Sequence, residues 1–114
     1  MRSKGPAVVD LPARFVSAIR EGRFREAATD PDLQARGTQR DDPVARALLI
    51  LAAAHYLALE GNIEGARLTF GRAVQLLEQA PLDAYAALLI DHSRAGLEAL
   101  QAGRAPPPLP LGFR

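Results

Sequence analysis

The sequence predicts an all-α fold, namely a small antiparallel bundle of about four to five helices around a central apolar helix. Apolar residues recur at helical spacing in several segments, and short turns that contain glycine or proline separate these segments. No segment shows the two-residue alternation that is typical of a half-buried strand. With 114 residues, the chain is expected to form one domain around a single core.

Residues 1–9 are predicted to be a flexible arm, and residues 10–103 are predicted to form the helical domain. Asp10 stands two residues before Pro12, and this pair predicts the start of the first helix. A carboxylate there can cap the free N–H groups of the first turn, and proline lacks an N–H that would otherwise stay unpaired. Gly22 is expected to end this helix.

Two short helical segments are expected next. The first covers residues 23–28 and is interrupted at Asp30-Pro31, because proline cannot continue a helix. Pro31 can start one further turn, which is expected to end at Arg36 with Gly37 as the residue that follows the helix. A loop is predicted from there to the next helix.

The next helix is predicted to be the central one. It starts at Asp42-Pro43, which repeats the first start signal, and it runs to about Glu60. Twelve of the thirteen residues from 47 to 59 are apolar, and His55 is the exception. A helix that is apolar on all sides is expected to be buried on most of them.

Two amphipathic helices complete the domain. Asn62 is expected to cap a helix over residues 63–79, and Asp83 is expected to cap a last helix that runs to about residue 102. Each helix carries one apolar stripe that can pack on its neighbours. The stripes consist of Ile63, Ala66, Phe70, Ala73, Val74 and Leu77 in the first helix, and of Leu82, Tyr85, Leu89, Gly96, Leu97 and Leu100 in the second.

The C-terminal segment, residues 104–114, is rich in proline and predicts an extended polyproline segment or a surface strap. Leu109, Leu111 and Phe113 are the apolar residues that such a strap can place against the bundle, or against a second copy of it.

The composition excludes several classes of protein. The chain has no cysteine, which excludes disulfides and thiolate metal sites. A net charge of +1 gives no electrostatic case for binding nucleic acid or an anionic membrane. No apolar run is long enough for a signal-peptide core or a membrane span. A cytoplasmic protein without a cofactor is therefore the expectation.

Two blocks of the sequence share one plan, in which a glycine turn is followed by an apolar residue and, three residues later, by alanine. The residues concerned, with their neighbours, are Gly22, Phe24, Glu26 and Ala27 in the first block, and Ala47–Ala54, Gly61, Asn62, Gly65, Ala66, Arg72, Ala73, Leu76 and Leu77 in the second. Small residues at this spacing let two helices approach closely, as in a tetratricopeptide helix pair. The two blocks resemble a small prokaryotic helical family that is catalogued as domain of unknown function 309. The resemblance implies a compact helical bundle of uncharacterised function.

The chain departs from that family after the first block. The family has a His-Glu pair there, whereas Ala28 and Thr29 stand at these positions here. If those polar groups form a site in the family, this chain has lost it.

The two histidines, His55 and His92, are the candidates for metal binding or acid–base chemistry. One helix presents two ligands to the same ion at a spacing of three or four residues, and neither histidine has a second ligand at that spacing. A metal-binding or hydrolytic site would need the two histidines to meet across helices, with Asp91 or Glu60 as a third group. The alternative makes His55 a hydrogen-bonded histidine at the edge of an apolar helix and His92 a partly solvated one.

A cluster of arginines provides a second alternative, which is RNA binding. Acidic residues lie between them, and the aromatic residues that base stacking requires are limited to Phe15 and Phe24. A solvated helix face explains the same pattern. The arginines are Arg14, Arg20, Arg23, Arg25, Arg36, Arg40 and Arg46.

The favoured interpretation is a protein-interaction or scaffolding module without catalytic activity. The apolar residues of the central helix and of the two stripes need more covering than the short first helices offer. A protein partner or a second copy is expected to cover the rest. The residues predicted to form this interaction surface are Tyr85, Leu89, Leu109, Leu111 and Phe113.

Overall fold

The computed structural model describes residues 10–81 and 83–112. Within these ranges the chain forms six α-helices and no strand, which confirms the predicted all-α fold. The helices are α1 (Ala13–Arg20), α2 (Phe24–Ala27), α3 (Pro31–Gln39), α4 (Pro43–Leu59), α5 (Ile63–Glu78) and α6 (Ala84–Gln101).

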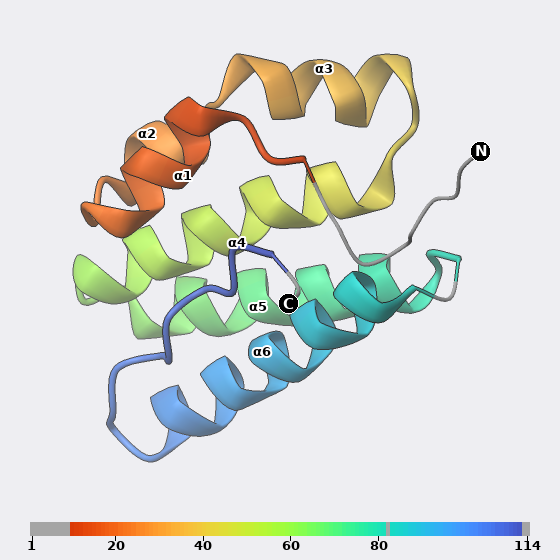
Figure 1. The fold of residues 1–114 in the computed structure, drawn as a ribbon. Helices are drawn as coiled ribbons and strands as arrows, with labels where there is room; N and C mark the ends of the chain where they lie inside the picture. Colours follow the sequence, from red (N-terminus) through yellow and green to blue (C-terminus); the bar gives the residue numbers. More distant parts are fainter. Residues whose placement is uncertain (1–9, 82, 113–114) are drawn as a thin grey trace.

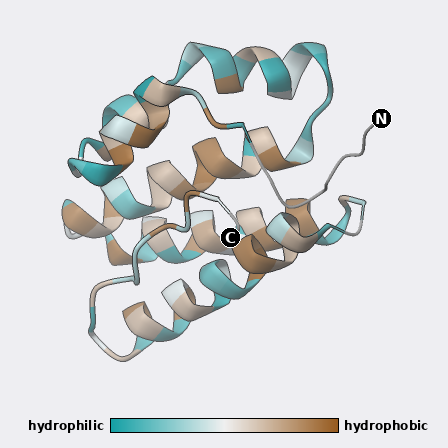
Figure 2. Ribbon diagram, viewed as in Figure 1, coloured by the Kyte–Doolittle hydropathy of each residue, from teal (hydrophilic) through white to brown (hydrophobic). Residues whose placement is uncertain are grey.

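The central helix is α4, as predicted. It packs against α2, α3 and α5 and also touches α6, while α5 packs between α4 and α6. Figure 1 shows α4, α5 and α6 side by side, with α1, α2 and α3 on the opposite side of α4. The apolar parts of the helices, brown in Figure 2, face one another, and the outward side of α3 is hydrophilic. The largest fully buried side chains include Phe15, Leu51, Phe70 and Tyr85.

Polar side chains cap four of the helices. The carboxylates of Asp30, Asp42 and Asp83 and the amide oxygen of Asn62 each accept hydrogen bonds from backbone N–H groups in the first turn of the helix that follows. These N–H groups would otherwise have no partner within the helix. The caps predicted at Asp42, Asn62 and Asp83 are confirmed.

The cap predicted at Asp10 is wrong. Helix α1 begins at Ala13, with Pro12 at the N-cap position and no side-chain cap. Asp10 instead contacts α3 through its backbone, because its carbonyl accepts a hydrogen bond of 2.8 Å from the guanidinium of Arg36.

The helix end predicted at Gly37 is also wrong, since α3 continues to Gln39. Arg46 of α4 lies over Gly37, so a Cβ atom there would be 2.6 Å from Cγ of Arg46. The Arg46 guanidinium also donates a hydrogen bond of 3.0 Å to the carbonyl of Gly37. The absence of a side chain at Gly37 therefore allows α3 and α4 to approach closely, and Gly37 does not end a helix.

The segment after α6 packs on the bundle, and we call its described residues 104–112 the strap. It contains neither helix nor strand, and the blue trace in Figure 1 turns back from the end of α6 across the bundle. Leu109 is buried and Leu111 is half-buried against the core. The hydroxyl of Tyr85 donates a hydrogen bond of 2.8 Å to the carbonyl of Pro110. The predicted surface strap is thus confirmed for these residues, and Phe113 lies outside the described ones.

No helix in the described part of the chain combines the length and the apolar character that crossing a membrane requires.

Candidate functional site

Three helices end close together at one end of the bundle. Gly22 follows α1 and Gly103 follows α6, with φ angles of 76° and 75° that favour glycine. Each glycine N–H, and the N–H of the next residue, donates back into the last helical turn, which is the Schellman arrangement. Helix α4 ends in the same way at the predicted Gly61 turn. These endings place the last residues of α1, α4 and α6 around one space.

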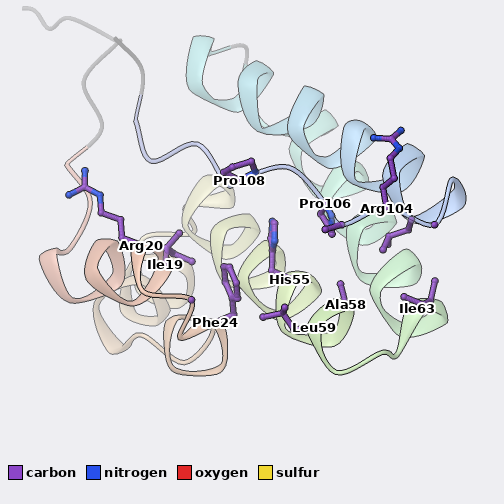
Figure 3. A pocket seen from close by; sticks show the side chains of 14 residues that line it. Ile19, Arg20, Phe24, His55, Ala58, Leu59, Ile63, Arg104, Pro106 and Pro108 are labelled. Carbon is purple, nitrogen blue, oxygen red and sulfur yellow. The ribbon is translucent and has the colours of Figure 1, made fainter.

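That space is a pocket of about 700 Å³. Its walls come from the ends of α1, α4 and α6, from α2, from the start of α5 and from the strap, as Figure 3 shows from close by. The lining is mostly apolar. The lining residues are Ile19, Arg20, Gly22, Phe24, His55, Ala58, Leu59, Ile63, Leu100, Gly103, Arg104, Ala105, Pro106 and Pro108.

Apolar and basic side chains lie together on the exposed part of this lining. Leu59 is 67% exposed and Ile63 is 43% exposed, so two large apolar side chains of the lining are in contact with solvent. Arg20 and Arg104 lie on opposite sides of the pocket in Figure 3. Within the described residues, neither guanidinium forms an ion pair, and the lining contains no carboxylate.

His55 and His92 meet across α4 and α6, with 3.0 Å between their Nε2 atoms. Both side chains are buried, at 5% and 6% exposure. The ring planes differ by 13° and the ring centroids are 5.2 Å apart. That separation equals the Nε2–Nε2 distance plus roughly one ring radius on each side. The two imidazoles therefore meet edge to edge in a nearly linear hydrogen bond, and not face to face.

Two phenylalanines enclose the histidine pair. Phe24 of α2 stacks on His55 with a centroid separation of 4.9 Å and an interplanar angle of 19°. Phe70 of α5 presents its ring edge-on to both imidazoles. His55 borders the pocket, whereas His92 is not part of the lining.

The pKa of each imidazole is lowered from 6.5 to about 4, by burial for His55 and by burial together with the proximity of His55 for His92. Both rings are therefore neutral at pH 7. In a neutral pair one Nε2 carries the proton of the hydrogen bond and the other accepts it.

The structure brings the two predicted histidines together. It does not bring Asp91 or Glu60, the third group that the metal-binding alternative requires, to the histidine pair. Asp91 and Glu60 are both exposed. The described residues contain no cluster of three or more side chains that could hold a metal ion. The hydrogen-bonded His55 is confirmed, whereas a partly solvated His92 is wrong. Consecutive helical residues point about 100° apart, so α6 can turn His92 inward and Asp91 outward.

The residues predicted to form the interaction surface mostly cover one another within the chain. Tyr85 and Leu89 are fully buried and Leu109 is buried, while Leu111 is half-buried. The three buried residues are not exposed to a partner, because the strap covers this side of α6. This prediction is therefore corrected for Tyr85, Leu89 and Leu109, whereas Leu111 stays partly exposed and Phe113 lies outside the described residues.

Several of the arginines considered for RNA binding have partners within the chain. Arg23 pairs with Glu21 at 3.0 Å and with Glu26 at 2.6 Å. Arg46 pairs with Asp41 at 2.7 Å. The interleaved acidic residues thus neutralise part of the basic cluster, as a solvated helix face requires.

The sequence does not predict the pocket. It places Arg104 in the tail and Leu59 in a helix that is buried on most sides, although both line the pocket. The glycine turns that end α1, α4 and α6 are visible in the sequence, but no local signal shows that these helix ends meet in space.

Comparison of the chain with family models, with curated proteins and with solved structures finds no match. The resemblance to domain of unknown function 309 stays a prediction.

Proposed function

We propose that this chain is a binding module without catalytic activity, and that its pocket holds the apolar part of a small amphipathic anion. The observation that carries the proposal is the pocket itself, an apolar space of about 700 Å³ between helix ends. Small-molecule sites are typically concave, mostly apolar and roughly 300 to 1,000 Å³ in volume, with a few polar groups that orient the ligand. His55, Arg20 and Arg104 are such groups.

The charges around the pocket favour an anionic head group. Three helix C-termini each contribute a partial negative charge of about one half. Arg20 and Arg104 contribute two full positive charges, and the described lining has no carboxylate to offset them. The arginines therefore outweigh the helix ends. A carboxylate, sulfonate or phosphate can lie near one of them in water while the apolar chain enters the pocket.

A hydrolytic site built on His55, Asp91 and His92 has less support. Both imidazoles are hydrogen-bonded to each other, and a pKa of about 4 makes each a weak base at pH 7. Asp91 is exposed and adjacent in sequence, so it does not orient His92 toward a substrate.

Titration of the isotope-labelled protein with sodium octanoate tests the proposal. We expect saturable amide shifts that are concentrated at the pocket lining. Leu59→Glu should weaken octanoate binding by about tenfold or more, because it removes an apolar contact and places a negative charge beside the head group. Ala87→Glu is the matched control, since it adds the same charge to an exposed position at the other end of α6. Unsaturable shifts over the whole surface, or equal weakening by both variants, would contradict the proposal.

The predicted protein-interaction module is the second candidate, and the exposure of three large apolar side chains favours it. Leu59, Ile63 and Leu68 all exceed 40% exposure. A second copy of this chain is the partner to test, because a net charge of +1 produces little repulsion between copies. Light scattering over a dilution series should show a dimer that Leu68→Glu dissociates. A monomer at every concentration would exclude a second copy of this chain as the partner.

A further inference from the structure

The buried histidine pair has two ring protons and only one place for a proton between the rings. Two neutral imidazoles carry one N–H each. One proton lies in the hydrogen bond between the Nε2 atoms, which are 3.0 Å apart. The ring that accepts this bond must carry its own proton on Nδ1. One of the two Nδ1 atoms is therefore a donor, and the other is a bare acceptor.

The surroundings of the two Nδ1 atoms differ. Among the described residues neither atom has a hydrogen-bond partner, since the Nε2–Nε2 contact is the hydrogen bond that these rings form. Both side chains are almost equally buried, at 5% and 6% exposure, but only His55 borders the pocket. A buried N–H without a partner is rarer and less tolerated than a buried acceptor without one. A donor on His92 would stay unpaired, but a donor on His55 can bond to whatever fills the pocket.

We propose that His92 donates to His55, that the second proton lies on Nδ1 of His55, and that the floor of the pocket thereby offers one hydrogen bond to an oxygen acceptor on the ligand. This inference rests on the proposed function and names the ligand class. The ligand is an amphipathic anion whose apolar chain carries a neutral carbonyl oxygen.

The geometry explains why the acceptor is neutral. Nδ1 lies across the ring from Nε2 and hence on the side away from His92. The His55 ring extends into the space between Phe24 and the strap prolines Pro106 and Pro108 (Figure 3). Removing the water around a carboxylate in this apolar space would cost far more free energy than one hydrogen bond contributes. Removing the water around a ketone or ester carbonyl costs little. The anionic group remains in water near Arg20 or Arg104.

His92 acts in this scheme as a positioning residue. It touches no ligand, but its donated proton fixes the tautomer of His55. Without that donor, His55 could place its proton on either nitrogen.

A matched series of ligands tests the inference. The probes are octanoate and its ketone analogues, with the carbonyl at successive carbons along the chain, each titrated against the wild-type protein. We expect one analogue to bind about fivefold more tightly than octanoate, since a neutral hydrogen bond adds a factor of this size. His55→Phe keeps an aromatic ring that can stack on Phe24, and in this variant the ketone analogue should bind no more tightly than octanoate.

The outcomes separate this inference from the proposed function. If no octanoate compound binds, the proposed function fails. If octanoate binds and every ketone analogue binds equally or more weakly, the inference alone fails. The same holds if the preference survives in His55→Phe, or if the corresponding alcohol is preferred to the ketone, because an alcohol can donate to a bare Nδ1.

A spectroscopic measurement keeps the test decisive if His55→Phe does not fold. Nitrogen-15 NMR of the imidazole rings distinguishes protonated from bare ring nitrogens. We expect protonated Nδ1 on His55 and protonated Nε2 on His92 in the ligand-bound wild-type protein. The opposite pair of tautomers would overturn the inference.

Discussion

His55 and His92 show how one contact makes two polar side chains tolerable inside an apolar domain. An imidazole without partners in such a place leaves both nitrogens without hydrogen bonds, which is costly. The shared hydrogen bond satisfies one nitrogen of each ring. The environment of His55 is predictable from the apolar helix around it. That of His92 is not, because Asp91 and Ser93 beside it suggest solvent, yet Ser93 is also buried and bonds to Leu89 of its own helix.

The pair makes the stability of the fold dependent on pH. In the unfolded chain each histidine takes up a proton near pH 6.5, but in the folded chain only near pH 4. Between these values the unfolded state binds more protons, so the free energy of unfolding falls as the pH is lowered. The slope reaches about 1.4 kcal/mol per pH unit for each histidine that is protonated in the unfolded state alone. The slope falls to half of this value at pH 6.5 and vanishes well above that pH, where both states are neutral.

Urea unfolding at pH 7.5, 6 and 5 measures this dependence. The double variant His55→Phe, His92→Phe is the control, and it should show a flatter profile over the same range. If the profile is equally steep in the double variant, the histidines are not its source.

The contact between α5 and α6 depends on one residue without a side chain. A Cβ atom at Gly96 would lie 2.8 Å from both Cε1 and Cζ of Phe70. Phe70 is fully buried and touches both imidazoles, so it cannot move without disturbing the histidine pair. Gly96 thus sets the distance between the two helices.

Gly96→Ala should destabilise the fold by about 1 to 3 kcal/mol, the usual effect of overpacking a core. This is expected although alanine is the better helix former by about 1 kcal/mol. Gly71→Ala is the matched control, because Gly71 lies inside α5 with no atom within 4 Å of the added Cβ. It should stabilise the protein by about 0.5 to 1 kcal/mol. Urea unfolding measures both, and equal effects of the two variants would refute the explanation.

Helix α4 matches its predicted environment along most of its length and departs from it in the last turn. Seven of its residues, from Ala45 to His55, are buried among α2, α3, α5 and α6. In the last turn Ala58 is half-buried and Leu59 is 67% exposed. The sequence predicts a helix that is buried on most of its sides, and α1, α2 and α3 on one side of α4 are shorter than α4 itself. Here the neighbouring helices end or begin at this level, and the pocket takes their place.

At the scale of the whole molecule, the predictable features are the local ones. Asp42, Asn62 and Asp83 cap their helices because each cap depends on three or four consecutive residues. The fold class and the central helix follow from periodicity in the same way. The pocket is lined by residues that are distant in sequence, such as Arg20 at the end of α1 and Arg104 in the strap. Such an arrangement depends on contacts between distant segments, which no local pattern specifies.

The strap is the last part of the described chain to leave the ribosome. The helices from α1 to α6 precede it in the sequence, and Pro106 and Pro108 add a wall to the pocket that these helices frame. A chain whose synthesis stops before the strap would therefore lack this wall.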